Sequence, residues 1–62
     1  MITEFEKGVE YDWKLELGSY FSNALEFKAK ADHASLIIHS VKSTLERPEC
    51  TKLYCNGELA NL

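Results

Sequence analysis

Apolar and charged side chains alternate without a break from Val9 to Leu17, in the run Val-Glu-Tyr-Asp-Trp-Lys-Leu-Glu-Leu. Successive side chains of a β-strand point to opposite faces of the sheet, so a period of two predicts a strand with one buried and one solvated face. Gly18-Ser19 interrupts the pattern. We therefore predict a strand over residues 9–17 that is followed by a turn.

A second alternation, with charged residues at the even positions 26, 28 and 30, predicts a return strand over residues 25–31 after a hairpin loop at 18–22. In one register every outward pair has opposite charges: Lys14 faces Glu26, Asp12 faces Lys28, and Glu10 faces Lys30. The same register pairs apolar side chains on the inner face: Leu15 with Leu25, Trp13 with Phe27, and Tyr11 with Ala29. A shift by two residues opposes like charges, so the pattern favours this register.

A competing interpretation is one long helix from about Ser19 to Glu46. Apolar residues follow a 4-3 spacing from Tyr20 to Leu45, and Ala-Leu-Glu-Phe-Lys-Ala-Lys-Ala has good helix propensity. That helix would deprive the strand at 9–17 of its charge-matched partner and would place Asp32-His33, which are poor helix formers, in its interior. We favour the hairpin.

From Asp32 onward the pattern indicates a helix. Asp32 is a good N-cap residue, Arg47 suits a last turn and Pro48 ends the helix. Its buried face is predicted from an apolar stripe: Ala34, Ile37, Ile38, Val41 and Leu45.

The C-terminal part predicts a strand over 51–55, followed by Asn56-Gly57, the strongest hairpin-turn dipeptide, and a return through 58–60; a frayed tail is the alternative. Residues 2–6 could add an edge strand. The fold class is then α+β in the order (β)-β-β-α-β: a mainly antiparallel sheet of three or four strands with one helix on one face, in a single domain over 1–62. A right-handed crossover through the helix would make the strands at 25–31 and 51–55 parallel.

Charge is unevenly distributed along the chain, which carries ten acidic and seven basic residues and a net charge of −3. Residues 1–17 hold five acids against Lys7 and Lys14, whereas the remainder is balanced. An acidic segment disfavours nucleic acid and favours a protein partner with a basic surface. A solvated face that only aids solubility is an equal alternative.

The sequence indicates a cytoplasmic protein without a membrane segment. No run approaches the roughly 20 apolar residues of a membrane span, and residues 1–6 lack the features of a signal peptide. Cys50 and Cys55 would lie about 16 Å apart in extended chain, beyond the roughly 4.4–6.8 Å between the Cα atoms of a disulfide. We expect two free thiols.

No catalytic or metal-binding constellation is recognisable. His33 and His39 lie six positions apart, so on a helix they point in different directions, and the cysteine spacing fits no zinc motif. Gly8, Gly18 and Gly57 are isolated, which gives no phosphate-binding loop and no nucleotide cofactor. We therefore predict a non-enzymatic protein without cofactors.

The candidate binding residues lie on the predicted hairpin. Glu10, Asp12 and Glu16 form its charged face, and Tyr20 and Phe21 present two aromatic rings at its tip, although Phe21 is also in phase with the core. The hypothesis is a small acidic protein-binding module that inhibits or neutralises a larger protein, as such domains do in phages and other mobile elements; the analogy rests on size and charge.

Two alternatives stay open. A structural subunit would self-associate through a sheet edge, giving a homodimer. A weak nucleic-acid binder would use a basic strip with an aromatic side chain: Lys28, Lys30, Lys52 and Tyr54.

Overall fold

Two eight-residue strands that pair along their whole length begin the fold. The computed structural model describes residues 1–18 and 23–62, and in it β1 (Glu10–Leu17) runs antiparallel to β2 (Asn23–Lys30). The register is the predicted one: Lys14 lies opposite Glu26, and Trp13 lies opposite Phe27. The chain is a strand from Asn23 to Lys30, so the alternative of one helix over 19–46 is wrong.

The helix α1 (Ala31–Ser43) differs from its prediction at both ends. Lys30, with extended backbone, is the N-cap residue, and Asp32 lies in the first turn, where its Oδ1 accepts a hydrogen bond from the backbone N–H of His33 at 2.8 Å. The helix ends well before Arg47. Thr44 is the C-cap residue, and its hydroxyl donates to the Val41 carbonyl at 2.8 Å. A short 3-10 helix, η1 (Pro48–Cys50), follows after an irregular segment.

The remaining strands complete a four-stranded sheet in the order β2-β1-β3-β4, with β3 (Thr51–Cys55) and β4 (Glu58–Ala60). Every strand pairs with its neighbour in the antiparallel sense. Because β2 and β3 are both antiparallel to the central β1, they run parallel to each other on its two sides, as predicted. The edge strand expected over residues 2–6 is reduced to one parallel bridge between Ile2 and Ala60.

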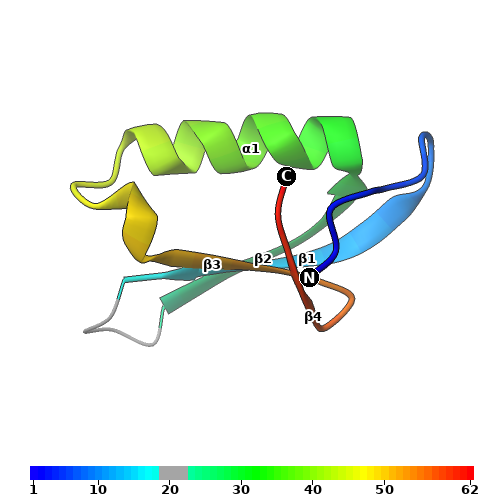
Figure 1. Cartoon of the computed structure of the whole chain (residues 1–62). Coiled ribbons are helices and arrows are strands. Elements are labelled where there is room, and N and C mark those ends of the chain that lie inside the picture. Colours follow the sequence, from blue (N-terminus) through cyan, green and yellow to red (C-terminus); the bar gives the residue numbers. More distant parts are fainter. Residues whose placement is uncertain (19–22) are drawn as a thin grey trace.

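The helix covers one face of the sheet and leaves the other face open (Figure 1). The buried residues come from all four strands and the helix: Trp13, Leu15, Ala29, Ala34, Ile38, Leu53, Cys55 and Ala60. Trp13, which is 2% exposed, donates a hydrogen bond from its indole Nε1 to the Ala29 carbonyl at 2.8 Å. This bond joins the central strand to the end of β2, where the chain enters the helix.

The N-terminal segment contributes an aromatic cover for the end of this core. Phe5 lies 5.2 Å from Trp13 and 5.8 Å from Tyr11, measured between ring centroids, and Tyr11 lies 5.9 Å from Trp13. Such edge-to-face and tilted pairs add stability beyond their buried area. The backbone N–H of Glu6 also donates to the Tyr11 hydroxyl at 2.9 Å. Phe5 and Glu6 are therefore held by contacts with side chains of β1, whereas Ile2 is held by its backbone pairing with β4.

The Asn56-Gly57 turn is confirmed, and it is fastened to the central strand. Both residues have positive φ, 51° and 87°, as a two-residue hairpin turn requires. The Asn56 side-chain Oδ1 accepts a hydrogen bond from the backbone N–H of Asp12 at 2.9 Å, and the backbone N–H of Asn56 donates to the Asp12 carbonyl at 2.8 Å. The turn thus continues the β1–β3 ladder beyond Cys55.

Replacing Trp13 by Phe tests the buried indole bond. We expect Trp13→Phe to lower the free energy of unfolding by about 1–3 kcal/mol, because the Ala29 carbonyl loses its donor in an apolar environment. Urea denaturation followed by far-ultraviolet circular dichroism measures the change. Leu36→Ala, at a position on α1 that is 73% exposed, is the control and should change stability by less than about 0.5 kcal/mol. Equal losses of unfolding free energy in both variants would mean that the indole hydrogen bond is not the cause.

Replacing Asn56 tests whether its side-chain hydrogen bond to β1 stabilises the turn. Asn56→Ala removes the acceptor for the Asp12 N–H and places a residue that disfavours positive φ in the turn, so we expect a loss of about 1–3 kcal/mol. Asn56→Asp keeps a side-chain oxygen and tolerates the same backbone conformation. It should retain most of the stability in the same urea experiment. If the two variants were equally unstable, the side-chain hydrogen bond would not be the cause.

Candidate functional site

The open face of the sheet, here called the outer face, is built by the even-numbered residues of β1 and β2. Their odd-numbered neighbours, including Trp13 and Leu15, are buried against the helix, so strand geometry points the even positions to solvent. The registers with β3 and β4 add three more side chains to this face. The outer face therefore comprises Glu10, Asp12, Lys14, Glu16, Ala24, Glu26, Lys28, Lys30, Lys52, Tyr54 and Leu59.

The three acidic residues predicted from the sequence as binding residues all lie on the outer face, each opposite a lysine of a neighbouring strand. Glu10 lies opposite Lys30 and Asp12 opposite Lys28 on β2, and Glu16 lies opposite Lys52 on β3. Of these pairs, Asp12 Oδ1 and Lys28 Nζ are 3.6 Å apart. Both side chains are well exposed, so the pair contributes at most about 1 kcal/mol.

The outer face carries no net charge, although the sequence placed an acidic excess in this part of the chain. Four carboxylates are matched by four ammonium groups: Glu10, Asp12, Glu16 and Glu26 against Lys14, Lys28, Lys30 and Lys52. The cause is the topology, since β1 lies between two strands that bring lysines. The net charge of −3 arises entirely from residues outside this face.

A row of side chains crosses the middle of the outer face, in the order Glu26, Lys14, Tyr54 and Leu59 from β2 to β4. The Lys14 ammonium lies 6.0 Å from the centroid of the Tyr54 ring, at the limit of a cation–π contact, and 3.9 Å from Glu16. Tyr54 is partly exposed, and Leu59 is 45% exposed. This row places an apolar and aromatic patch within a field of alternating charges.

An open hollow of about 780 Å³ lies over this part of the sheet. Its lining includes Asp12, Lys14, Glu16, Glu26 and Tyr54. The hollow is broad and charged, which suits contact with a convex protein surface more than enclosure of a small molecule. The outer face is therefore the candidate functional site.

Tyr54, Lys14 and Glu26 belong to this site but were not predicted as one set. The sequence indicates a strand at 51–55 without saying which strand it pairs with, and only the pairing with β1 brings Tyr54 beside Lys14. The lysines of the nucleic-acid alternative do share this face with Tyr54, but the acidic residues of β1 lie between those of β2 and those of β3. Tyr20 and Phe21 lie outside the described residues.

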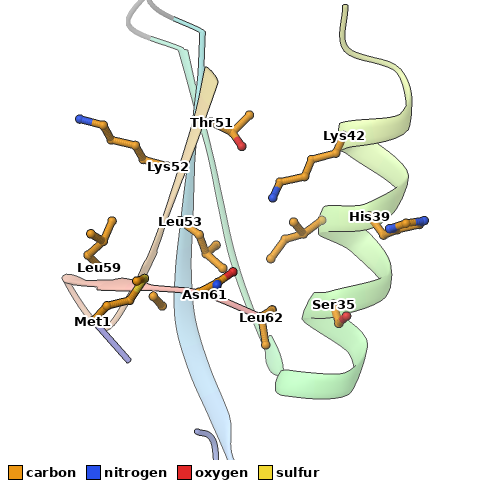
Figure 2. A pocket seen from close by; sticks show the side chains of 12 residues that line it. Met1, Ser35, His39, Lys42, Thr51, Lys52, Leu53, Leu59, Asn61 and Leu62 are labelled. Atoms are coloured by element: carbon orange, nitrogen blue, oxygen red, sulfur yellow. The ribbon is translucent and has the colours of Figure 1, made fainter. Parts of the chain in front are cut away.

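A second hollow, of about 370 Å³, lies between α1 and the β3–β4 end of the sheet (Figure 2). Its lining includes the apolar residues Ile38, Leu53 and Leu62. The side chain of Lys42 extends from the helix toward β3, whereas the His39 ring points away from the strands (Figure 2). The hollow lies where α1, which packs mainly on β1 and β2, has few contacts with β3.

The histidines and cysteines do not assemble into a metal site in the described residues. His33 and His39 are both exposed on α1, and no group of three or more His, Cys, Asp or Glu side chains in residues 1–18 and 23–62 is arranged to hold a metal ion. No helix in this part of the chain has the length and apolar character needed to cross a membrane.

Comparisons with protein-family models, with curated protein sequences and with solved structures found no match.

Cys55 is a buried free thiol that belongs to the core. It is 1% exposed, and its pKa is raised above the ordinary value, first by burial and then by the negative charges of Glu58 and Asp12. A raised pKa leaves less thiolate at a given pH, and the thiolate is the reactive form. The structure therefore gives Cys55 a packing role.

We expect Cys55 to react slowly with Ellman's reagent at about pH 8, and much faster once urea unfolds the chain. A Cys50→Ser background leaves Cys55 as the one thiol, because the chain holds two cysteines. Equal rates in the folded and unfolded protein would contradict this.

The same shift predicts how stability depends on pH. The unfolded chain releases the Cys55 proton at a lower pH than the folded chain, so this contribution to stability is complete below about pH 8 and declines as the pH rises through the ordinary thiol pKa of about 8.5. Urea midpoints measured across this range check the effect. A Cys55→Ala variant, which has no thiol to ionise, should lose less stability over the same pH interval.

Proposed function

We propose that this chain is a non-enzymatic protein-binding module whose contact surface is the outer face of the sheet. The observation that supports this most is the unequal covering of the two sheet faces: α1 covers the inner face, whereas the outer face presents eleven side chains to solvent. A broad surface with an open hollow suits contact with another protein better than enclosure of a small molecule.

The composition of the outer face fits an interface with a central contact and a charged rim. Tyr54 lies near the middle, and tyrosine is enriched among residues that contribute most of the binding energy. The surrounding charges alternate in sign across the strands. Alternating charges select a partner with the opposite arrangement and contribute more to specificity and association rate than to affinity.

The proposed partner is another protein that brings basic side chains to Asp12 and Glu16 and an apolar side chain to the Tyr54–Leu59 patch. β1 provides the attraction for basic side chains of the partner, since three of its four outward residues are acidic. The flanking lysines, Lys28 and Lys52, require acidic groups at the edge of the partner surface. Occupying the surface of a larger protein in this way would allow the module to block it, which is the mode of action we propose.

The test begins with affinity capture from the cells that produce the protein, followed by titration of the captured protein against purified variants. Asp12→Asn/Glu16→Gln removes two acidic charges with little change of shape, and we expect the affinity to fall about tenfold, equivalent to about 1.4 kcal/mol. The affinity of the variant should also depend less on salt concentration than that of the wild-type chain, because fewer ion pairs cross the interface.

Glu46→Gln/Glu49→Gln is the matched control, because it removes the same charge from two exposed residues outside the outer face. It should bind as the wild-type chain does. Equal loss of affinity in the site and control variants would mean that only the total charge matters, and the proposed contact surface would then be wrong.

A further inference from the structure

The β2 strand is an eight-residue sheet edge. One side of β2 pairs with β1 from Asn23 to Lys30, and no segment of the described chain pairs with its other side. The opposite edge of the sheet differs, because β4 has three residues and Ile2 covers part of it through a bridge and two backbone hydrogen bonds. Unpaired backbone groups along a strand of this length form a template for another strand.

The side chains of β2 make this edge complementary to itself. If two copies pair antiparallel about a two-fold axis at Phe27, then Glu26 of each copy lies opposite Lys28 of the other. On the inner face, Phe27 meets its own copy and Leu25 meets Ala29. Opposite-charge pairs and apolar pairs are the cross-strand neighbours that stabilise antiparallel sheets.

Neighbouring registers lack this match. A two-fold axis at Lys28 opposes two copies of Lys28, and an axis at Glu26 opposes two copies of Glu26, so each places like charges directly across the ladder. A register centred between two residues would set an outward-pointing residue opposite an inward-pointing one. The inner face of one sheet would then continue into the outer face of the other, and Phe27 would be exposed. The axis at Phe27 is thus the register that the charges and the two faces of β2 both select.

The helix adds a second apolar element on the same side. Ser35, His39 and Lys42 lie on the flank of α1 that borders the hollow beside β3, so the opposite flank of α1 lies on the β2 side. That flank carries one half-buried apolar residue, Ile37, with three polar neighbours: His33, Ser40 and Thr44. It holds no lysine or carboxylate, and a second copy of α1 can approach it without opposing fixed charges.

We propose that two copies of this chain associate through antiparallel pairing of their β2 strands, with Phe27 on the two-fold axis and reciprocal Glu26–Lys28 pairs on the outer face. The result is a continuous eight-stranded sheet with both helices on one side. An isologous contact of this kind closes at the dimer, since each copy uses its one long edge.

Sedimentation of the full chain over a range of concentrations measures the association. We expect a monomer–dimer equilibrium in the wild type. In Glu26→Lys, two like-charge pairs replace two opposite-charge pairs and should weaken dimerisation about tenfold or more. Glu26→Lys/Lys28→Glu restores opposite charges across the two-fold axis and should recover dimerisation. A wild-type chain that stays monomeric at every concentration would overturn the proposal.

The variants also change pairs within the monomer, because Glu26 lies opposite Lys14 and Lys28 contacts Asp12. Circular dichroism and a thermal melt therefore accompany each sedimentation run. Glu46→Lys makes the same charge change at an exposed residue outside β2 and should leave dimerisation unchanged. If Glu46→Lys weakened the dimer as much as Glu26→Lys does, net charge rather than β2 pairing would be responsible.

Disulfide trapping tests the register without relying on charge. In a Cys50→Ser background, a mixture of Glu26→Cys and Lys28→Cys chains should form a crosslinked dimer on mild oxidation, because directly opposite Cα atoms lie about 4.5–5.5 Å apart. Each variant alone should crosslink poorly, since its two copies are diagonal neighbours at about 7–8 Å. Equal crosslinking in the mixture and in the separate variants would overturn the proposed register.

Discussion

The double pairing of β1 is the constraint on which the rest of the structure depends. β1 is hydrogen-bonded to β2 on one side and to β3 on the other, and its odd-numbered residues Trp13 and Leu15 are buried beneath the helix. A strand that is fixed on both sides cannot shift its register without turning those two side chains to solvent. The Trp13 indole bond to Ala29 and the Asn56 bond to Asp12 then fasten the helix entry and the C-terminal turn to the same strand.

The single α-helix in the described residues explains why the two sheet faces differ so strongly. A chain of 62 residues has one α-helix in its described part, which is enough to cover β1 and β2 but leaves a hollow beside β3. No segment of residues 1–18 and 23–62 covers the outer face, so its charges remain solvated, and each acid on β1 lies opposite a lysine. The core is therefore a single layer between helix and sheet, and surface chemistry is concentrated on the opposite side.

The two proposed contact surfaces use different features of the same sheet. The proposed protein-binding surface depends on side chains that point away from the outer face, with Tyr54 near its centre. The proposed dimer depends on the backbone edge of β2, on the inner residue Phe27 and on the Glu26–Lys28 pairs at the β2 side of the outer face. Dimerisation would place two outer faces side by side in one continuous sheet, and a partner with two equivalent sites could then bind both.

Local patterns in the sequence determined the β1–β2 hairpin, the helix and the Asn56-Gly57 turn, because alternation, an apolar stripe and turn chemistry act between residues that are near each other in the chain. The same patterns placed the helix ends wrongly. Lys30 rather than Asp32 precedes the first turn, and the Thr44 hydroxyl bonds to the Val41 carbonyl before Arg47 is reached. Only the tertiary structure decided that β3 lies beside β1, which brings Tyr54 to Lys14 and Lys52 to Glu16 and cancels the charge of the outer face. The residues of these two pairs are 40 and 36 positions apart in the chain. They meet because of the order of the strands, which depends on burying one common face under the helix and leaves no periodic signal in the sequence.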